Sequence, residues 1–123
     1  MGSEMCIRDR VNAVREAGCA AGVAVCPSTP PDVFAQVAPE LALCMTVNPG
    51  WGGQPFIEAM LGKVEALRST LGPDVEIEVD GGITATTAAR CRAAGASLFV
   101  AGSAVFGSGD PARAYAELAA AVT

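Results

Sequence analysis

The stretch VEIEVDGGITATTAARCRAAGASLFVAG at residues 75–102 holds the signals that decide the fold. Residues 75–79 are typical of a strand, and the Asp-Gly-Gly turn at 80–82 follows directly. A helix is expected over 84–94, because a threonine can cap its start and a glycine follows its last residue. The apolar run at 97–101 predicts a second strand. A strand, a helix and another strand in this order indicate a parallel β/α unit.

The same alternation extends in both directions from this unit. The helices upstream and downstream are expected to be amphipathic, and those at 31–38 and 111–122 begin with proline in the first turn. In the last helix, Ala114, Tyr115, Leu118 and Val122 are expected to face the core. The remaining elements are predicted as a helix over 11–17 ending at Gly18, a strand over 22–26, a short helix over 31–38 capped by Thr29, a strand over 41–47, a loop over 48–55 and a helix over 56–71.

This order of elements predicts an α/β fold with four parallel β/α units. Most of the strands lack polar alternation, which is typical of a sheet buried on both faces. Two architectures remain open, a four-stranded doubly wound sheet or part of an eight-stranded barrel. We interpret residues 1–10, MGSEMCIRDR, as a non-native prefix to a domain at 11–123. The alternative is a first helical turn that leads into residues 11–17.

Composition excludes several classes of function. The 123 residues carry 8 basic and 13 acidic side chains, a net charge of -5, and no histidine. A nucleic-acid partner is not expected, since binding to a phosphate backbone usually needs a basic stripe. The apolar runs are too short for a membrane span, and no secretory signal precedes them, so we expect a cytoplasmic protein. The five cysteines have neither disulfide nor zinc-site spacing and are interpreted as buried free thiols.

Candidate functional residues gather at the predicted carboxyl ends of the strands, where α/β proteins place their sites. Three of these ends are rich in glycine, which lets backbone N–H groups approach an anion closely. Phosphate binding is one interpretation, and tight strand-to-helix turns without a ligand are the other. Trp51 could close over a ligand or anchor its loop, and Met45 is expected in the core. The candidate phosphate-binding residues at these strand ends are Gly50, Gly52, Gly53, Gly81, Gly82, Gly102 and Ser103.

Asp80 is the carboxylate that ends a buried strand. It could bind a metal or act as a general acid or base, and a loop-bracing role is the alternative. Glu76 and Glu78 share its side-chain parity on the strand, so they either line the same face or belong to an irregular stretch. Periodicity does not decide between these.

Three motifs resemble the ribulose-phosphate 3-epimerase family: MTVNPGWGGQPF at 45–56, EVDGGI at 78–83 and FVAGSAVF at 99–106. GVAVCPSTP at 22–30 matches as well, and the resemblance extends over residues 11–123. It implies a (β/α)8 barrel that interconverts D-ribulose 5-phosphate and D-xylulose 5-phosphate. Catalysis would use two aspartates on opposite faces of C3 and a divalent metal, which is zinc, manganese, iron or cobalt.

The resemblance also implies roles for individual residues. Asp80 would be both the second acid–base aspartate and a metal ligand. Met45 would place its sulfur near the metal. Substrate and phosphate would contact Gly50, Trp51, Gly52, Gly53, Gly81, Gly82, Gly102 and Ser103.

A barrel of this type needs about 200 to 250 residues, so this chain is expected to be its C-terminal half. The serine, the two histidines and the first aspartate of the family's early strands have no counterpart here. We therefore expect a chain that is nearly inactive alone, with open edges at strands 22–26 and 97–101, and a full-length form that is a homo-oligomer. The alternatives are an epimerase of another ketose phosphate, such as allulose 6-phosphate, and a non-catalytic phosphate-binding half-barrel.

Overall fold

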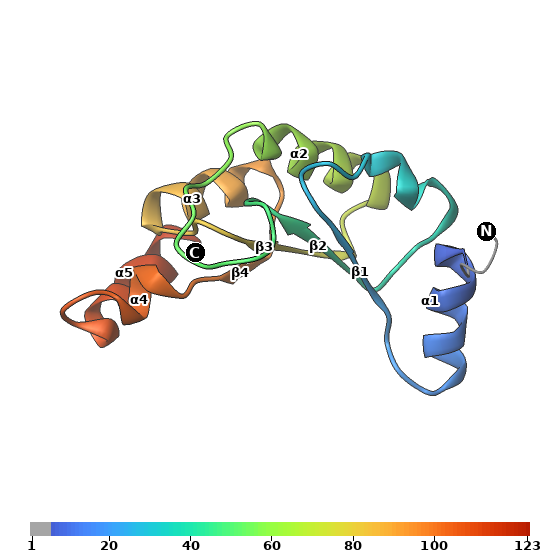
Figure 1. The fold of residues 1–123 in the computed structure, drawn as a ribbon, viewed down its shortest axis with the longest axis horizontal. Helices are drawn as coiled ribbons and strands as arrows, with labels where there is room; N and C mark the ends of the chain where they lie inside the picture. The colour runs from blue at the N-terminus through green and yellow to red at the C-terminus, as the bar shows by residue number, and fades with distance from the viewer. Residues whose placement is uncertain (1–5) are drawn as a thin grey trace.

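The computed structural model describes residues 6–123, which fold around one four-stranded sheet in the order β1-β2-β3-β4. Every neighbouring pair of strands is parallel, and helices alternate with the strands (Figure 1). The predicted α/β class with four parallel β/α units is therefore confirmed. The strands are β1 (Gly22–Val25), β2 (Leu41–Met45), β3 (Glu76–Asp80) and β4 (Leu98–Val100).

The helices are distributed unevenly around the sheet (Figure 1). The two helices α2 and α3 lie over one face, α1 lies beyond β1, and α4 and α5 lie beyond β4. Among the described residues, no helix combines the length and hydrophobicity of a membrane span. The helices are α1 (Ile7–Glu16), the 3-10 helix η1 (Pro31–Gln36), α2 (Met60–Leu71), α3 (Ala85–Ala94), α4 (Ser103–Phe106) and α5 (Pro111–Ala121).

The core lies between the sheet and helices α2 and α3. Alternate residues of each strand point toward these helices, because successive strand side chains face opposite sides. Leu67 and Val64 of α2 are fully buried in this layer. The strand and α3 side chains that pack there are Val25, Ala42, Cys44, Ile77, Val79, Ala88 and Cys91.

The opposite face of the sheet is not covered by these helices, as expected for a face that would line the interior of a barrel of which this chain forms half. Leu98 and Val100 are 36% and 40% exposed on this face. Glu76 is exposed and Glu78 is partly exposed. As expected, the strands at the two edges of the sheet are β1 and β4.

Local hydrogen bonds shift several predicted element boundaries. Thr29 does not cap the helix that follows, since its hydroxyl accepts a hydrogen bond from Cys26 N at 3.1 Å. Helix α2 begins at Met60 rather than Phe56, because Ile57 N donates to Thr46 O, at the end of β2, instead of to a carbonyl within a helix.

Other differences concern the ends of the chain. Helix α1 begins at Ile7, so residues 7–10 form a helical turn that runs into 11–16. Residues 1–5 of the interpreted prefix lie outside the described residues. Tyr115 is 65% exposed and does not face the core. Leu118 and Val122 of the same helix pack against the core. Helix α4 was not predicted.

Two basic side chains of α2 connect the helix to backbone carbonyls at opposite ends of the sheet. Lys63 Nζ donates to Cys26 O at 3.1 Å, to Pro27 O at 3.0 Å and to Thr29 O, so it closes the loop after β1. Arg68 donates to Gly72 O and to Val75 O, each at 2.7 Å, and so fixes the turn before β3. These bonds position α2 relative to the strands that it covers.

Candidate functional site

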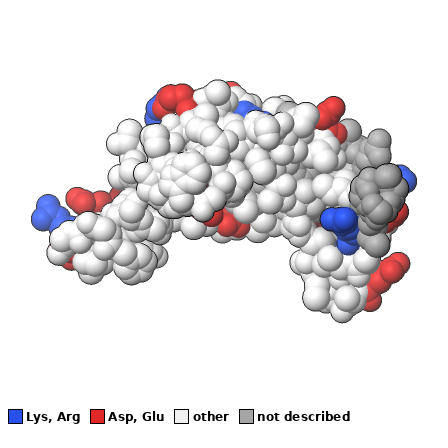
Figure 2. All heavy atoms as spheres, viewed as in Figure 1, with Lys and Arg blue, Asp and Glu red and all other residues white. Residues whose placement is uncertain are grey.

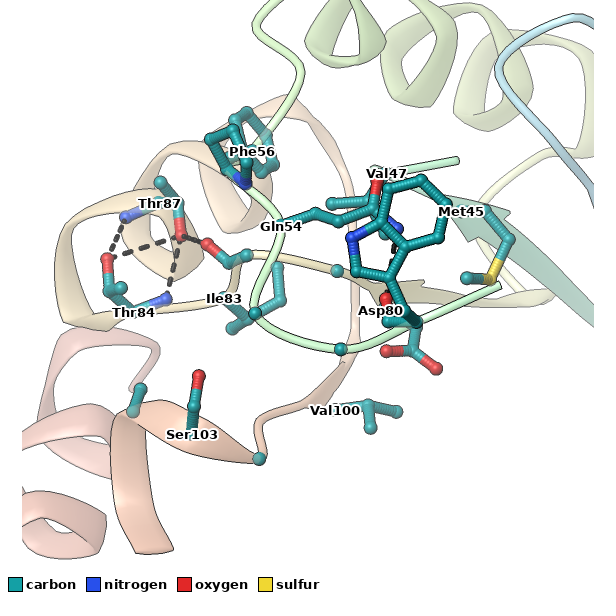
Figure 3. A pocket seen from close by; sticks show the side chains of 18 of the residues that line it. Met45, Val47, Gln54, Phe56, Asp80, Ile83, Thr84, Thr87, Val100 and Ser103 are labelled. Atoms are coloured by element: carbon teal, nitrogen blue, oxygen red, sulfur yellow. Dashed lines mark hydrogen bonds between the residues drawn. The ribbon is translucent and has the colours of Figure 1, made fainter. Parts of the chain in front are cut away.

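A cavity of about 670 Å³ opens where β2, β3 and β4 end (Figure 3). The carboxyl ends of parallel strands meet at one edge of a sheet, which explains why loops distant in sequence come together here. Its lining includes Met45 and every predicted site residue: Gly50, Trp51, Gly52, Gly53, Asp80, Gly81, Gly82, Gly102 and Ser103. The fold therefore brings together the residues that the sequence predicts at the strand ends.

Asp80 is the last residue of β3 and lies between two residues of the neighbouring strands. Its register partners are Met45 on β2 and Val100 on β4, and its carboxylate lies between these two side chains (Figure 3). Ile77 and Val79 are fully buried toward the helices. The strand is thus regular, and Glu78 shares the open face with Asp80.

The loop between β2 and α2 forms one wall of the cavity. Gln54 Nε2 donates to Asn48 O at 2.6 Å and to Trp51 O at 2.9 Å, which holds the loop in a closed turn. Gly53 has φ of 75°, a conformation that a side chain would strain. Trp51 is 71% exposed at the rim of the cavity, so it does not anchor the loop by burial.

The Gly81-Gly82 turn forms the floor between β3 and α3. Both residues have positive φ, 128° and 66°. A Cβ on Gly81 would lie 2.5 Å from Val47 Cγ2, and one on Gly82 would lie 2.6 Å from Phe56 N. Glycine is needed here both for its conformation and for the close approach of the loop.

Thr46 joins this turn to β2. Its side chain is completely buried, and its hydroxyl donates to Gly81 O at 2.5 Å. Its own N–H donates to Asp80 O and its carbonyl accepts from Ile57 N, both at 2.9 Å. One residue therefore links the end of β2, the end of β3 and the returning loop.

The first turn of α3 also contacts the Gly81-Gly82 turn, through the side chain of Thr87. Thr84 and Thr87 form a reciprocal capping box, as the threonine at the start of this helix predicts. The Thr87 hydroxyl also donates to Gly82 O at 2.8 Å. Gly102 and Ser103 complete the cavity from the end of β4, where Gly102 caps the short helix α4.

Among the described residues, those that line the cavity include no cationic side chain, and Asp80 is the one ionisable residue in that set. On the face of the described residues in Figure 2, lysine and arginine side chains are isolated from one another. An anion in this cavity would therefore be bound by neutral donors, chiefly backbone N–H groups, which glycine-rich turns expose.

Two buried cysteine thiols outside the cavity have raised pKa values. Burial raises the pKa of the Cys44 and Cys91 thiols to about 11. All five cysteines are free, as expected, but Cys6 and Cys19 are exposed and Cys26 is partly buried, so burial is confirmed for two of them. These thiols have no place in the candidate site.

A metal ion in the cavity would need several ligand side chains close together. Within residues 6–123, no group of three or more His, Cys, Asp or Glu side chains is placed to hold a metal ion. Protein metal sites usually need at least three such ligands. Asp80 can supply one ligand, and the described residues do not supply the others.

Sequence reasoning did not single out three side chains that shape the cavity, namely Thr46, Gln54 and Thr87. Gln54 carried a usable signal, because it is the one long amide side chain in a loop of glycine and proline. The two threonines carried none, since their hydroxyls meet carbonyls of the glycine turn only in the folded chain.

Comparisons with known proteins match this chain to sugar-phosphate enzymes. The family model of the Ribulose-phosphate 3 epimerase family matches residues 3–106. The ribulose-phosphate 3-epimerase of Candida glabrata is 46% identical over 103 residues, which are 82% of this chain and 42% of that protein. The Bacillus subtilis enzyme is 42% identical over 114 residues, 88% of this chain and 52% of its own length.

A solved structure agrees with the fold. The crystal structure of a 3-hexulose-6-phosphate synthase superimposes with a TM-score of 0.66 and 25% identity over 95% of this chain and 56% of that one. The parallel β/α architecture and the family match define the class of this chain as α/β, within a family named for an epimerase of ribulose phosphate. The chain belongs to the ribulose-phosphate 3-epimerase family. It spans about half the length of the curated relatives that it matches.

Proposed function

We propose that this chain contributes one acid–base carboxylate and the phosphate-binding turns to a ribulose-phosphate 3-epimerase site. The observation that supports this most directly is that Asp80 lines the same cavity as the glycine-rich turns. The reaction would interconvert D-ribulose 5-phosphate and D-xylulose 5-phosphate. Family membership supports an isomerase, and the choice of substrate is part of the proposal.

Asp80 would exchange a proton with C3 of the sugar. When its carboxylate takes the C3 proton, the C–H electron pair moves toward the C2 carbonyl and an enediolate forms. Return of a proton to the opposite face of C3 inverts that centre and restores the carbonyl. A second acid–base group must deliver this proton, because one carboxylate does not reach both faces of a planar enediolate.

The substrate phosphate would bind to backbone N–H groups of the turns around the cavity. The glycines at 50, 52 and 53, at 81–82 and at 102 let the backbone approach an anion without interference from a Cβ. Trp51, at the rim, would cover the sugar. Neutral donors suit a phosphate that must enter and leave, since they bind without forming a buried ion pair.

The family resemblance further assigns Asp80 to a divalent metal. Because the described residues supply one ligand of such a site, no step of the proposed mechanism is derived through a metal. Because Asp80 alone would serve as both the acid–base carboxylate and the metal ligand, this chain is proposed to be nearly inactive in isolation.

A chimeric enzyme tests the proposal. Residues 11–123 of this chain would replace the matching stretch of the Bacillus subtilis enzyme, which is 42% identical. We expect the chimera to convert D-ribulose 5-phosphate, and Asp80→Asn to lower kcat by about three orders of magnitude or more, because an essential proton-transfer group is lost. Asp74→Asn is the matched control, since Asp74 is an exposed carboxylate in the turn before β3.

The same assay separates the alternatives. Full activity in the Asp80→Asn chimera would exclude an acid–base role. Faster conversion of D-allulose 6-phosphate than of D-ribulose 5-phosphate would favour an epimerase of another ketose phosphate. A folded chimera that binds phosphate but turns over neither sugar would favour a phosphate-binding role without catalysis.

A further inference from the structure

The two carbonyls of the Gly81-Gly82 turn are each bound by a threonine hydroxyl from a different element. Thr46 at the end of β2 donates to Gly81 O, and Thr87 in the first turn of α3 donates to Gly82 O. The two hydroxyls come from separate elements, one from the end of the sheet strand and one from the helix that follows the turn. Such a pair fixes two successive peptide planes.

A trans peptide holds its C=O and the following N–H antiparallel, because the unit is planar. The structure contains no cis peptide among the described residues. When Thr46 binds Gly81 O, the N–H of Gly82 must point away from the buried threonine. When Thr87 binds Gly82 O, the same constraint orients the N–H of Ile83.

These two peptide planes carry the N–H groups of Gly82, which is partly exposed, and of Ile83, which is buried. Within residues 6–123, neither Gly82 N nor Ile83 N donates a hydrogen bond to a protein acceptor. Both residues line the cavity. Glycine at this turn is otherwise free to rotate its peptides, so its donors need an external restraint to be aligned in advance.

The alignment of these N–H groups matters in this cavity because, in the part of the chain that the structure describes, no cationic side chain lines it. A lysine or arginine would attract a phosphate from many directions, whereas a backbone N–H must point at it to bind. We propose that Thr46 and Thr87 are positioning residues that hold the peptide donors of the glycine turn toward the substrate phosphate. This inference rests on the proposed function, since it concerns the same phosphate site.

The test measures binding of inorganic phosphate to the full chain labelled with 15N, by following the amide signals of Gly82 and Ile83. Thr46→Val keeps the shape of the side chain and removes its hydroxyl, and Thr46→Ser restores the hydroxyl. We expect Thr46→Val to weaken phosphate binding about tenfold, the effect of losing roughly one aligned hydrogen bond, and Thr46→Ser to bind nearly as the unmodified chain does.

A matched control separates positioning from simple loss of stability. Thr29→Val removes a threonine hydroxyl that accepts from Cys26 N in the loop after β1, away from the cavity. It should lower stability without changing phosphate affinity. If Thr46→Val does not fold, Thr87→Val takes its place, because Thr87 is only partly buried.

Phosphate affinity in a folded Thr46→Val or Thr87→Val variant equal to that of the unmodified chain would overturn the positioning role and leave the proposed function intact. An unmodified chain that binds no phosphate would overturn both. Weaker binding in the valine variants, with recovery in the serine variant, supports the role, because a purely structural effect would also appear in Thr29→Val.

Discussion

Replacing glycines of the cavity by alanine should give a graded loss of stability that reports the packing of the Asp-Gly-Gly turn. Gly82 has φ of 66°, and a Cβ there would lie 2.6 Å from Phe56 N. Gly53 has φ of 75° but open space around the added atom. Gly52 has open space and no positive φ, so the three positions separate conformational strain from steric overlap.

The expected magnitudes follow from these differences. Gly52→Ala should change the free energy of unfolding by less than about 0.5 kcal/mol, as at other exposed sites. Gly53→Ala should lower it by about 1 kcal/mol, the cost of a left-handed conformation for alanine. Gly82→Ala adds overlap with a backbone atom and should lower it by about 2–5 kcal/mol.

Equilibrium urea unfolding of the three variants and the unmodified chain measures these differences, provided that the slope with denaturant is unchanged. For a domain whose total stability is about 5–15 kcal/mol, the loss in Gly82→Ala should be obvious. The reasoning fails if Gly82→Ala is no less stable than Gly53→Ala, because the loop would then not pack against the turn as closely as described.

Three further outcomes follow from contacts elsewhere in the fold. Cys44 and Cys91 should resist alkylation at pH 8 until the chain unfolds, whereas the exposed cysteines should react at once. Peptide mass spectrometry measures the labelling of each cysteine, and equal labelling rates would contradict the burial of Cys44 and Cys91. Lys63→Met should lower the free energy of unfolding by about 1–3 kcal/mol, because the ammonium group that donates to three loop carbonyls is removed. An unchanged urea midpoint would refute this. Arg90 lowers the pKa of Glu58 from its usual 4.5, so the ion pair should stabilise the fold above that pH and lose its effect as pH falls through the lowered pKa. The stability difference between the unmodified chain and Glu58→Gln should therefore disappear in acid; a difference that persists at pH 2 would argue against the pair.

The elements that sequence reasoning placed best have their signals within one short segment. Helix α3 begins after Thr84 and ends before Gly95, as expected, because its cap and its stop act through neighbouring backbone groups. The strand expected at 75–79 is likewise present as β3, at Glu76–Asp80. Such local rules need no knowledge of the rest of the fold.

The misplaced elements depend on partners far along the chain. The start of α2 shifts to Met60 because Ile57 is held by Thr46, a contact between a loop and a strand. Thr29 is a local exception, because its hydroxyl accepts a hydrogen bond from Cys26 N three residues earlier and so does not cap the next helix. Tyr115 faces outward although its spacing matches the apolar side of α5. Periodicity gives the direction of a side chain, but only packing shows whether another element covers it.

The sequence by itself determined the order of strands and helices, the glycine turns at the strand ends and the presence of Asp80 among them, because these follow from local conformational preference and parallel connection. Tertiary structure decided which side chains restrain that site. Thr46 and Thr87 meet the carbonyls of one glycine turn from two separate elements. Such a pairing arises only when β2, β3 and α3 pack together, since a hydroxyl's hydrogen-bond partner is set by distance in space rather than along the chain.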